Sequence, residues 1–247
     1  MRWSLYLIGS LLISPAAIAD ETTLAVAANF ASPAKRIADQ FMQRTGHRIA
    51  LSSGSTGKFY AQIKSGAPFD AFLSADEETP LRLEREKLAV ADSRFTYAIG
   101  KLVLWSPREG MVDDRGSVLR TRSFNRLAIA NPRLAPYGAA AKEVMEKLGV
   151  WQAMQDKLVQ GENIAQTYQF VSSGNADLGF IALSQLHERG AAAGAQWLVP
   201  PDLHAPLRQD AVLLTRGMDK AAAREFLEYL RSATARELIG SFGYGLP

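Results

Sequence analysis

The stretch that decides the fold is TLAVAANFASPAKRIADQFMQRTGHRIALSSGSTG, residues 23–57. It opens with an apolar run over 23–28 that is typical of a buried strand. A helical pattern follows over 33–44, with Ser32 as the expected N-cap and a proline at the first helical position. A second apolar run, 49–52, predicts another strand. Strand, helix and strand in this order indicate a parallel β-α-β unit in a sheet covered by helices.

The same alternation continues toward the C-terminus, so the chain as a whole is predicted to be α/β. No internal repeat of fixed period interrupts it. Further strands are predicted at 71–73, 102–105, 127–130, 178–182 and 211–214, and further helices at 58–64, 77–87, 138–148, 163–171, 220–231 and 233–242.

The chain carries no low-complexity linker that would mark a single domain boundary. We therefore expect two α/β lobes, each with a mixed or parallel sheet covered by helices, joined by more than one crossing of the chain. Lobe 1 is predicted to be discontinuous and lobe 2 continuous. The predicted ranges are 20–101 plus 211–247 for lobe 1 and 102–210 for lobe 2, with crossings near 102–106 and 206–212.

Composition places the chain among ordinary globular proteins and excludes several classes. Of 247 residues, 47% are hydrophobic and 21% charged, which excludes a disordered or collagen-like chain. The 28 Lys and Arg residues against 25 Asp and Glu are spread without long runs, which argues against a nucleic-acid partner. No cysteine is present, which excludes disulfides, thiol nucleophiles and lipid attachment through cysteine.

The first 19 residues are typical of a signal peptide. Arg2 precedes an apolar run over 5–13, and the small residues of 16–19 form a cleavage motif. A membrane anchor is the alternative, but the apolar run is shorter than the roughly 20 residues that span a bilayer. We therefore predict cleavage after Ala19 and an exported protein.

Four loops combine backbone donors and hydroxyls at predicted strand ends or helix starts. In open α/β sheets, ligands bind at the carboxyl ends of strands, where helix N-termini offer unpaired N–H groups. Arg133 and Lys58 are the basic residues within or next to these loops, so the pattern favours an oxyanion held by neutral hydrogen bonds. The loops are 27–30, 52–57, 131–138 and 161–164.

Each loop also has a purely structural interpretation. Asn29 could cap a helix, and the 54–57 segment could be only a turn. Tyr137 could be a packed aromatic residue, and Ile164 a core residue. The recurrence of such loops in both predicted lobes favours the binding hypothesis over these alternatives.

Nucleotide, metal and serine-nucleophile chemistry find little support. The 52–59 segment fails as a phosphate-binding P-loop, because Ser52 replaces its first glycine and Phe59 its Ser or Thr. No Gly-x-Ser-x-Gly elbow is present. His47, His187 and His204 lack the spacing of zinc ligands.

Carboxylates around 69–76 are a further possibility for acid–base chemistry. We interpret Asp70, Asp76 and Glu77 as caps and surface charge: Asp76 suits a helix N-cap, and Asp70 stands at the entry to a strand.

At these residues the chain resembles the periplasmic molybdate-binding proteins of molybdate ABC importers. The resemblance runs from about 23 to 245. It implies a two-lobed, type II periplasmic-binding-protein fold with a ligand cleft between the lobes, and no enzymatic activity. It is carried by the segments 27–30, 54–63, 66–76, 128–132, 135–138 and 176–180.

The resemblance also implies a ligand set for a tetrahedral oxyanion, with no metal cation and no cofactor. Ser55 is the second choice beside Thr56, because the run of hydroxyl residues leaves the match ambiguous by one residue. A tyrosine that some members place near position 182 is absent here. Carried over by position, the ligand residues are Ala28, Asn29, Ser55, Thr56, Tyr137 and Ile164.

As further implications, the ligand is molybdate or tungstate, the partner is the membrane permease of an ABC importer, and the protein is a periplasmic monomer. Two alternatives stay open. One is a binding protein for another oxyanion, such as sulfate or phosphate, or for a small organic acid. The other is an exported hydrolase that uses the same cleft, with Asp70 as general base.

Overall fold

The structure, a computed structural model, describes residues 19–187 and 194–247. Apart from Ala19, the predicted signal peptide lies outside the described residues, so its cleavage stays a prediction. Within the two described ranges, no helix combines the length and the apolar character needed to cross a membrane.

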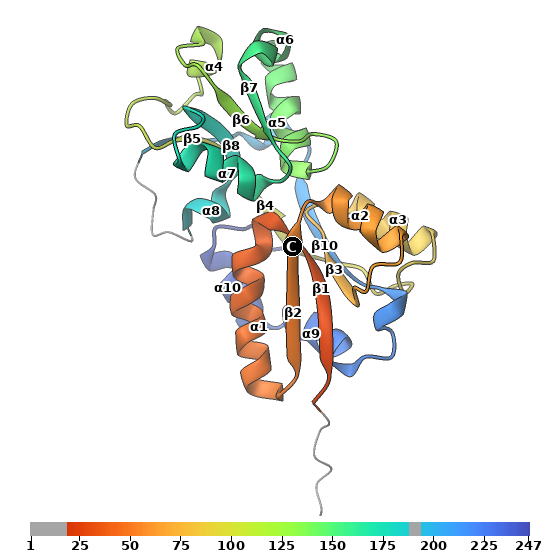
Figure 1. The fold of residues 1–247 in the computed structure, drawn as a ribbon. Helices are drawn as coiled ribbons and strands as arrows, with labels where there is room; N and C mark the ends of the chain where they lie inside the picture. Colours follow the sequence, from red (N-terminus) through yellow and green to blue (C-terminus); the bar gives the residue numbers. More distant parts are fainter. Residues whose placement is uncertain (1–18, 188–193) are drawn as a thin grey trace, which may run out of the picture.

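The chain forms two five-stranded sheets, each covered by helices on both faces (Figure 1). The first has the order β2-β1-β3-β10-β4. Strand β1 runs parallel to β2 and β3, whereas β10 runs antiparallel to β3 and β4. The strands are β1 (Glu21–Ala27), β2 (Arg48–Gly54), β3 (Ala71–Leu73), β4 (Phe95–Gly100) and β10 (Leu207–Leu213).

Alternating side chains of the first sheet pack into two hydrophobic cores, one on each face. Leu24 and Val26 of β1 pack with α1, α9 and α10, whereas Ala25 between them packs with α2 and α3. This period-two alternation is what a strand buried on both faces requires. The helices are α1 (Ala31–Thr45), α2 (Thr56–Lys64), α3 (Glu78–Arg85), α9 (Ala221–Leu230) and α10 (Ala233–Ser241).

The second sheet has the order β7-β6-β8-β5-β9, with β6 parallel to β7 and β8, and β5 antiparallel to β8 and β9. One face packs against α4, α5 and α6 and the other against α7 and α8. The elements are β5 (Leu102–Ser106), α4 (Val118–Thr121), β6 (Leu127–Ala130), α5 (Pro136–Lys147), α6 (Trp151–Met154), η2 (Gln155–Lys157), β7 (Leu158–Gly161), α7 (Ile164–Ser172), β8 (Leu178–Ala182), α8 (Leu183–His187) and β9 (Ala195–Leu198).

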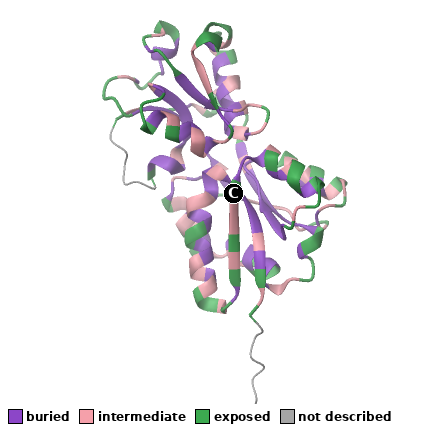
Figure 2. Ribbon diagram, viewed as in Figure 1, coloured by how far each residue is buried: buried purple, intermediate pink, exposed green. Residues whose placement is uncertain are grey.

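The chain passes between the two sheets twice, once from β4 to β5 and once from β9 through η3 (Pro201–Leu203) to β10. Two further short helices complete the fold, η1 (Ala28–Phe30) and η4 (Thr215–Gly217). Figure 2 shows the strands of both sheets largely buried and the outer faces of the helices exposed. The predicted two-lobed α/β fold is confirmed; the residue ranges assigned to the two lobes stay a prediction.

The start of the first long helix was predicted wrongly. Helix α1 begins at Ala31, and Phe30 rather than Ser32 occupies the N-cap position. The chain leaves β1 through the short helix η1, which runs directly into α1, so no side-chain cap is required. Strands β4, β7 and β9 were not predicted.

Candidate functional site

A small cavity lies where the ends of strands from the first sheet meet helix starts of the second lobe. We call it the central cavity. It offers only about 10 Å³ to the centre of a water-sized sphere, which is near the minimum that admits one water molecule. It is lined by Ala27, Ala28, Asn29, Gly54, Ser55, Thr56, Ala75, Ala135, Pro136, Asn163 and Ile164.

Four helix N-termini meet at the central cavity. Ala28, Thr56, Pro136 and Ile164 are the first residues of η1, α2, α5 and α7. The first turn of a helix leaves backbone N–H groups without intrahelical partners and carries the positive end of the helix dipole. None of the lining residues is charged, so the positive potential here comes from backbone dipoles.

The buried hydroxyl of Ser55 has no hydrogen-bond partner among the described residues. Ser55 is the N-cap residue of α2, yet its side chain makes no capping bond to the helix. It is only 3% exposed, so water does not readily satisfy it. A buried hydroxyl without a partner costs about 1–3 kcal/mol, so Ser55, on the wall of the cavity, is a candidate hydrogen-bond donor to a ligand.

Thr56 offers a second hydroxyl. Its Oγ1 accepts a hydrogen bond from the Ala75 backbone N–H at 3.1 Å, which leaves its own proton for another acceptor. Its backbone N–H starts α2 and has no partner in the described part of the chain. Thr56 therefore presents two donors beside Ser55.

The first turn of α7 brings a backbone donor from the second lobe. The Asn163 side chain caps the helix by accepting from the Ala165 and Gln166 N–H groups at 3.0 Å each. This leaves the Ile164 N–H without a partner within the described ranges. The Ile164 carbonyl oxygen accepts from Gln185 Nε2 at 3.0 Å, which helps to hold the start of the helix in place.

Asn29 lines the cavity, but its side-chain amide is already engaged. Its Nδ2 donates to Gln209 Oε1 at 2.8 Å and lies 3.0 Å from the Tyr244 hydroxyl oxygen. Asn29 does not cap a helix through its side chain, which removes that structural interpretation. Its backbone N–H is the group left to face an anion.

Tyr137 is buried beside the cavity without being part of its lining. Its hydroxyl oxygen accepts from Gln209 Nε2 at 3.1 Å. Burial raises the pKa of the Tyr137 hydroxyl well above its ordinary value, so the group is protonated at neutral pH. The following Gly138 lets α5 approach β6, because a Cβ there would stand 2.2 Å from the Ala130 carbonyl oxygen.

The structure thus brings five of the six predicted site residues to one cavity and places the sixth, Tyr137, directly behind it. Sequence analysis did not predict roles for Ala75, Gln209 or Tyr244. Ala75 follows β3 and so occupies a strand end like those already considered. Gln209 and Tyr244 are more than 150 residues from Asn29 in sequence, and no local motif marks them.

Asp70 lies away from the central cavity and is not a surface charge, which corrects our interpretation of it. It is fully buried, and its carboxylate accepts from Thr22 Oγ1 at 3.0 Å and pairs with Lys220 Nζ at 2.9 Å. Its backbone N–H donates to the Thr23 carbonyl oxygen. Thr23 lies four residues before Ala27, a lining residue of the cavity on the same strand, which is about 13 Å at 3.3 Å per residue. Asp70 therefore joins β1, β3 and the start of α9.

The prediction that Asp76 is a helix N-cap was wrong by one residue, because Glu77 holds the N-cap position of α3 and Asp76 stands just before it. The Asp76 carboxylate accepts from the Thr79 N–H at 2.8 Å and from Thr79 Oγ1 at 3.0 Å. Within the described ranges, no group of three or more His, Asp or Glu side chains could hold a metal ion.

Comparison with known proteins places the chain in a family. Residues 22–245 match the family model described as bacterial extracellular solute-binding protein. The chain belongs to this family. Membership confirms the prediction of a solute-binding protein rather than an enzyme.

Individual relatives refine this assignment. The solute-binding protein is 54% identical over 240 residues to the molybdate-binding protein ModA of Azotobacter vinelandii, covering 97% of this chain and 95% of that protein. It is 50% identical over 228 residues to ModA of Rhodobacter capsulatus, covering 92% and 89% of the two chains. The resemblance to molybdate-binding proteins is therefore confirmed.

The fold agrees as well. The structure of a periplasmic molybdate-binding protein of Azotobacter vinelandii superposes with a TM-score of 0.89 at 40% sequence identity. The match covers 92% of this chain and 99% of that one. The predicted two-lobed periplasmic-binding-protein fold is confirmed.

Proposed function

We propose that this protein captures molybdate, and also tungstate, in the central cavity and delivers it to the membrane permease of an ABC importer. The observation that carries the proposal is the buried, unpartnered Ser55 hydroxyl on the wall of a cavity where four helix N-termini meet. Relatives of 54% and 50% identity over nearly the whole chain, named for molybdate binding, support the choice of ion.

The donor set favours a dianion over a neutral or cationic solute. The Thr56 and Ile164 backbone N–H groups and the hydroxyls of Ser55 and Thr56 can all donate hydrogen bonds. Bonds from neutral donors to an anion are roughly twice as strong as those between neutral groups. Because no lining side chain is cationic, a phosphoester site built on Arg and Lys is disfavoured.

The cavity admits only about one water molecule and must widen to hold a tetrahedral oxyanion, so its size favours one compact ion over a larger organic acid. Sulfate and phosphate are also tetrahedral oxyanions, so selection among these ions must rest largely on cavity size. Tungstate has nearly the size and charge of molybdate, and we expect little discrimination between the two. Binding of sulfate or phosphate alone would make this a receptor for that other oxyanion.

The proposed ligand residues are Ala28, Asn29, Ser55, Thr56, Tyr137 and Ile164. Of these, Thr56 provides a matched pair of variants. Thr56→Val removes the hydroxyl at nearly constant shape and should weaken molybdate binding about 10-fold or more, since hydrogen bonds to charged groups contribute about 1.5–3 kcal/mol. Thr56→Ser keeps the hydroxyl and should retain most of the affinity.

Isothermal titration calorimetry of the mature, anion-stripped protein tests the proposal directly. Tight one-to-one binding of molybdate and tungstate with far weaker binding of sulfate is the expected result. Absence of molybdate and tungstate binding would overturn the proposed function. The exposed Ser53→Ala, two residues from Ser55, serves as a control of matched chemistry.

Closure of the lobes around the ion accompanies binding in this proposal. The lobes are residues 20–101 with 211–247 and residues 102–210, and they move as a hinge about the two chain crossings. Export to the periplasm with cleavage after Ala19 is tested by mass spectrometry of the secreted protein. The monomeric state, which leaves both lobes accessible to a permease, is tested by light scattering.

A further inference from the structure

Gln209 occupies a fully buried position between the two lobes. It lies on β10, a strand of the first sheet, and its side chain reaches Tyr137 on α5 of the second lobe. The packing around it is tight, because a Cβ on Gly100 would stand 2.7 Å from Gln209 Nε2 and 2.2 Å from the Tyr137 hydroxyl oxygen. An uncharged polar side chain in such a place needs partners for both ends of its amide.

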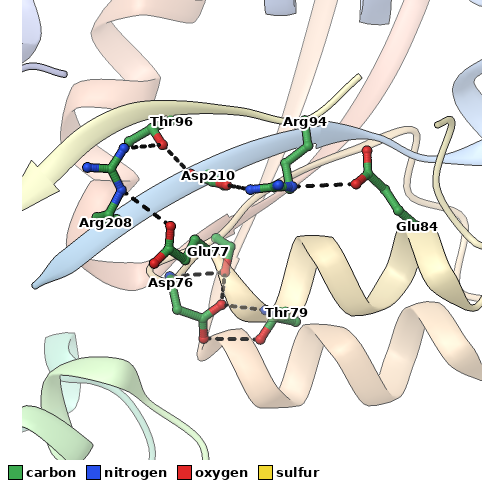
Figure 3. Close-up of polar contacts among 9 residues, drawn as sticks. Asp76, Glu77, Thr79, Glu84, Arg94, Thr96, Arg208 and Asp210 are labelled. Carbon is green, nitrogen blue, oxygen red and sulfur yellow. Dashed lines mark hydrogen bonds and ion pairs between the residues drawn. The ribbon is translucent and has the colours of Figure 1, made fainter. Parts of the chain in front are cut away.

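The neighbouring residues of β10 hold this stretch of strand in position (Figure 3). Asp210 accepts from Thr96 Oγ1 at 2.7 Å and is paired with Arg94, while the Arg208 guanidinium lies 3.3 Å from the Glu77 carboxylate. The register with β4 shifts between Gln209 and Asp210, a bulge of the kind that re-aims side chains.

The direction of the hydrogen bonds around Gln209 follows from one fixed acceptor, the backbone carbonyl oxygen of Asn29. The Tyr244 hydroxyl donates to this oxygen at 2.7 Å. A hydroxyl has a single proton, so the Asn29 side-chain atom 3.0 Å from the Tyr244 oxygen must be the amino group, Nδ2. That assignment sets the orientation of the Asn29 amide.

The next two bonds follow in sequence. Asn29 Nδ2 also donates to Gln209 at 2.8 Å, so the Gln209 atom that faces it is the oxygen, Oε1. The other end of the Gln209 amide, Nε2, therefore faces the Tyr137 hydroxyl at 3.1 Å and donates to it. The Tyr97 hydroxyl lies 3.1 Å from Oε1 but also donates to the Ser74 carbonyl oxygen at 2.8 Å, so its single proton adds no support for this orientation.

Tyr137 is consequently an acceptor toward Gln209, and its own proton has to point elsewhere. In the described part of the chain, Gln209 is the one hydrogen-bond partner of the Tyr137 hydroxyl. The proton is thus available to an acceptor outside the described residues, and Pro136, the preceding residue, lines the central cavity.

We propose that Gln209 is a positioning residue that fixes the Tyr137 hydroxyl as a hydrogen-bond donor toward the bound oxyanion. This inference rests on the proposed function, because it assigns how one residue of that site is oriented. Gln209 itself does not touch the ion. It transmits the orientation set at Asn29 in the first lobe to Tyr137 in the second, and so favours anion binding only when the lobes are together.

A double-mutant cycle with Tyr137→Phe and Gln209→Met tests the inference by molybdate titration. Tyr137→Phe should weaken binding about 10- to 100-fold, the value of a hydrogen bond to a charged group. Gln209→Met, of similar length, should give a comparable loss. Adding Gln209→Met to Tyr137→Phe should change Kd by less than about 3-fold, because the residue acts through the missing hydroxyl. Gln152→Met, the same substitution at an exposed glutamine of α6, should leave Kd unchanged.

Gln209→Glu is a second variant for the case that Gln209→Met does not fold, since it keeps the shape of the side chain. A carboxylate at this position accepts the Tyr137 proton, so binding should weaken more than in Gln209→Met. An infrared difference spectrum of the otherwise unaltered protein, with Tyr137→Phe as reference, gives a readout without any change at Gln209. When molybdate is added, the frequency of the Tyr137 C–O stretch should shift from that of a hydroxyl that only accepts a hydrogen bond to that of a hydroxyl that also donates one.

The outcomes separate this inference from the proposed function. Wild-type protein that binds molybdate, with a Gln209→Met Kd within 3-fold of it, overturns the role of Gln209 alone. Fully additive losses of affinity in the double-mutant cycle, or a Tyr137 C–O band that molybdate leaves unchanged, also overturn the role of Gln209. Wild-type protein that binds none of the oxyanions overturns both.

Discussion

Replacing Ser55 by alanine should change stability and binding in opposite directions. The Ser55 hydroxyl is buried and has no hydrogen-bond partner among residues 19–187 and 194–247, so removing it from the anion-free protein relieves a desolvation cost. N-cap serines normally contribute about 0.5–2 kcal/mol through their side chain. Here the side chain makes no capping bond, so little of that contribution is lost.

We therefore expect Ser55→Ala to stabilise the ligand-free protein by about 1 kcal/mol, within the 1–3 kcal/mol range for an unsatisfied buried hydroxyl. For a chain of this size, that raises Tm by roughly 2–4 °C. The same change removes one hydrogen bond to the anion, worth about 1.5–3 kcal/mol, and should weaken molybdate binding roughly 10- to 150-fold.

Differential scanning calorimetry of the anion-stripped protein and titration calorimetry with molybdate measure the two effects separately. Ser53→Ala should alter neither by more than about 0.5 kcal/mol, because Ser53 is exposed. A lower Tm for ligand-free Ser55→Ala would show that the hydroxyl has a structural partner. An unchanged affinity would show that it does not face the ion, and either result would refute the reasoning.

Three further predictions concern closure, packing and pH. Gly57→Ala should weaken molybdate binding a few-fold, because the added Cβ would stand 3.1 Å from Leu134 across the cleft. It should lower the Tm of the ligand-free protein by no more than a few degrees. Titration calorimetry measures the affinity and scanning calorimetry the Tm. Asp70→Asn should destabilise the fold by about 1–3 kcal/mol in urea unfolding, since it weakens the hydrogen bonds of a buried carboxylate whose partner Lys220 is 35% exposed, while protein that folds should keep its affinity. Burial raises the pKa of Asp177, but hydrogen bonds from the backbone N–H groups at 125–126 outweigh burial and lower the pKa overall. The contribution of Asp177 to stability is therefore present above its unfolded pKa and lost as the pH falls through its folded pKa. Urea unfolding of wild type and Asp177→Asn should accordingly converge in acid.

The elements predicted well from sequence are those whose hydrophobic pattern is set by burial on both faces. Strands 71–73, 127–130 and 178–182 were predicted with the bounds that the structure gives. Strand β7 was missed because its sequence lacks a continuous apolar pattern. This agrees with its place in the fold, where Leu158 and Val159 are only partly buried. The start of α1 was missed because a 3-10 turn at Ala28 replaces a side-chain cap, and capping motifs do not report such a turn.

The candidate site divides in the same way. Ser55, Thr56 and Ile164 were predictable because each stands at a helix start, which is a local property of the sequence. Gln209 and Tyr244 were not, since their role depends on a buried polar network among segments distant in the chain. The side-chain bonds of Asn29 could be assigned only once these partners were known.

Binding and closure are joined at a single helix end. The Thr56 N–H at the start of α2 faces the cavity, while the next N–H, of Gly57, donates to the Leu134 carbonyl oxygen of the second lobe at 2.9 Å. Lys58 then pairs with Glu162 across the cleft at 3.0 Å, with both side chains more than half exposed. An anion that draws α2 toward α5 and α7 therefore brings all three contacts together.

These direct contacts between the lobes join protein groups and do not involve the ion, so they add a constant stabilisation to the closed state whatever ion is bound. Selectivity cannot come from them, because a contact of equal strength for every ligand shifts no preference among ligands. In the proposed site, selectivity has to come from the proposed ligand groups whose hydrogen bonding depends on the ion, namely Ser55, Thr56, Ile164 and the Tyr137 hydroxyl. Weakening the Lys58–Glu162 pair with Lys58→Gln should therefore raise Kd for molybdate and sulfate by the same small factor, whereas Ser55→Ala should change their ratio.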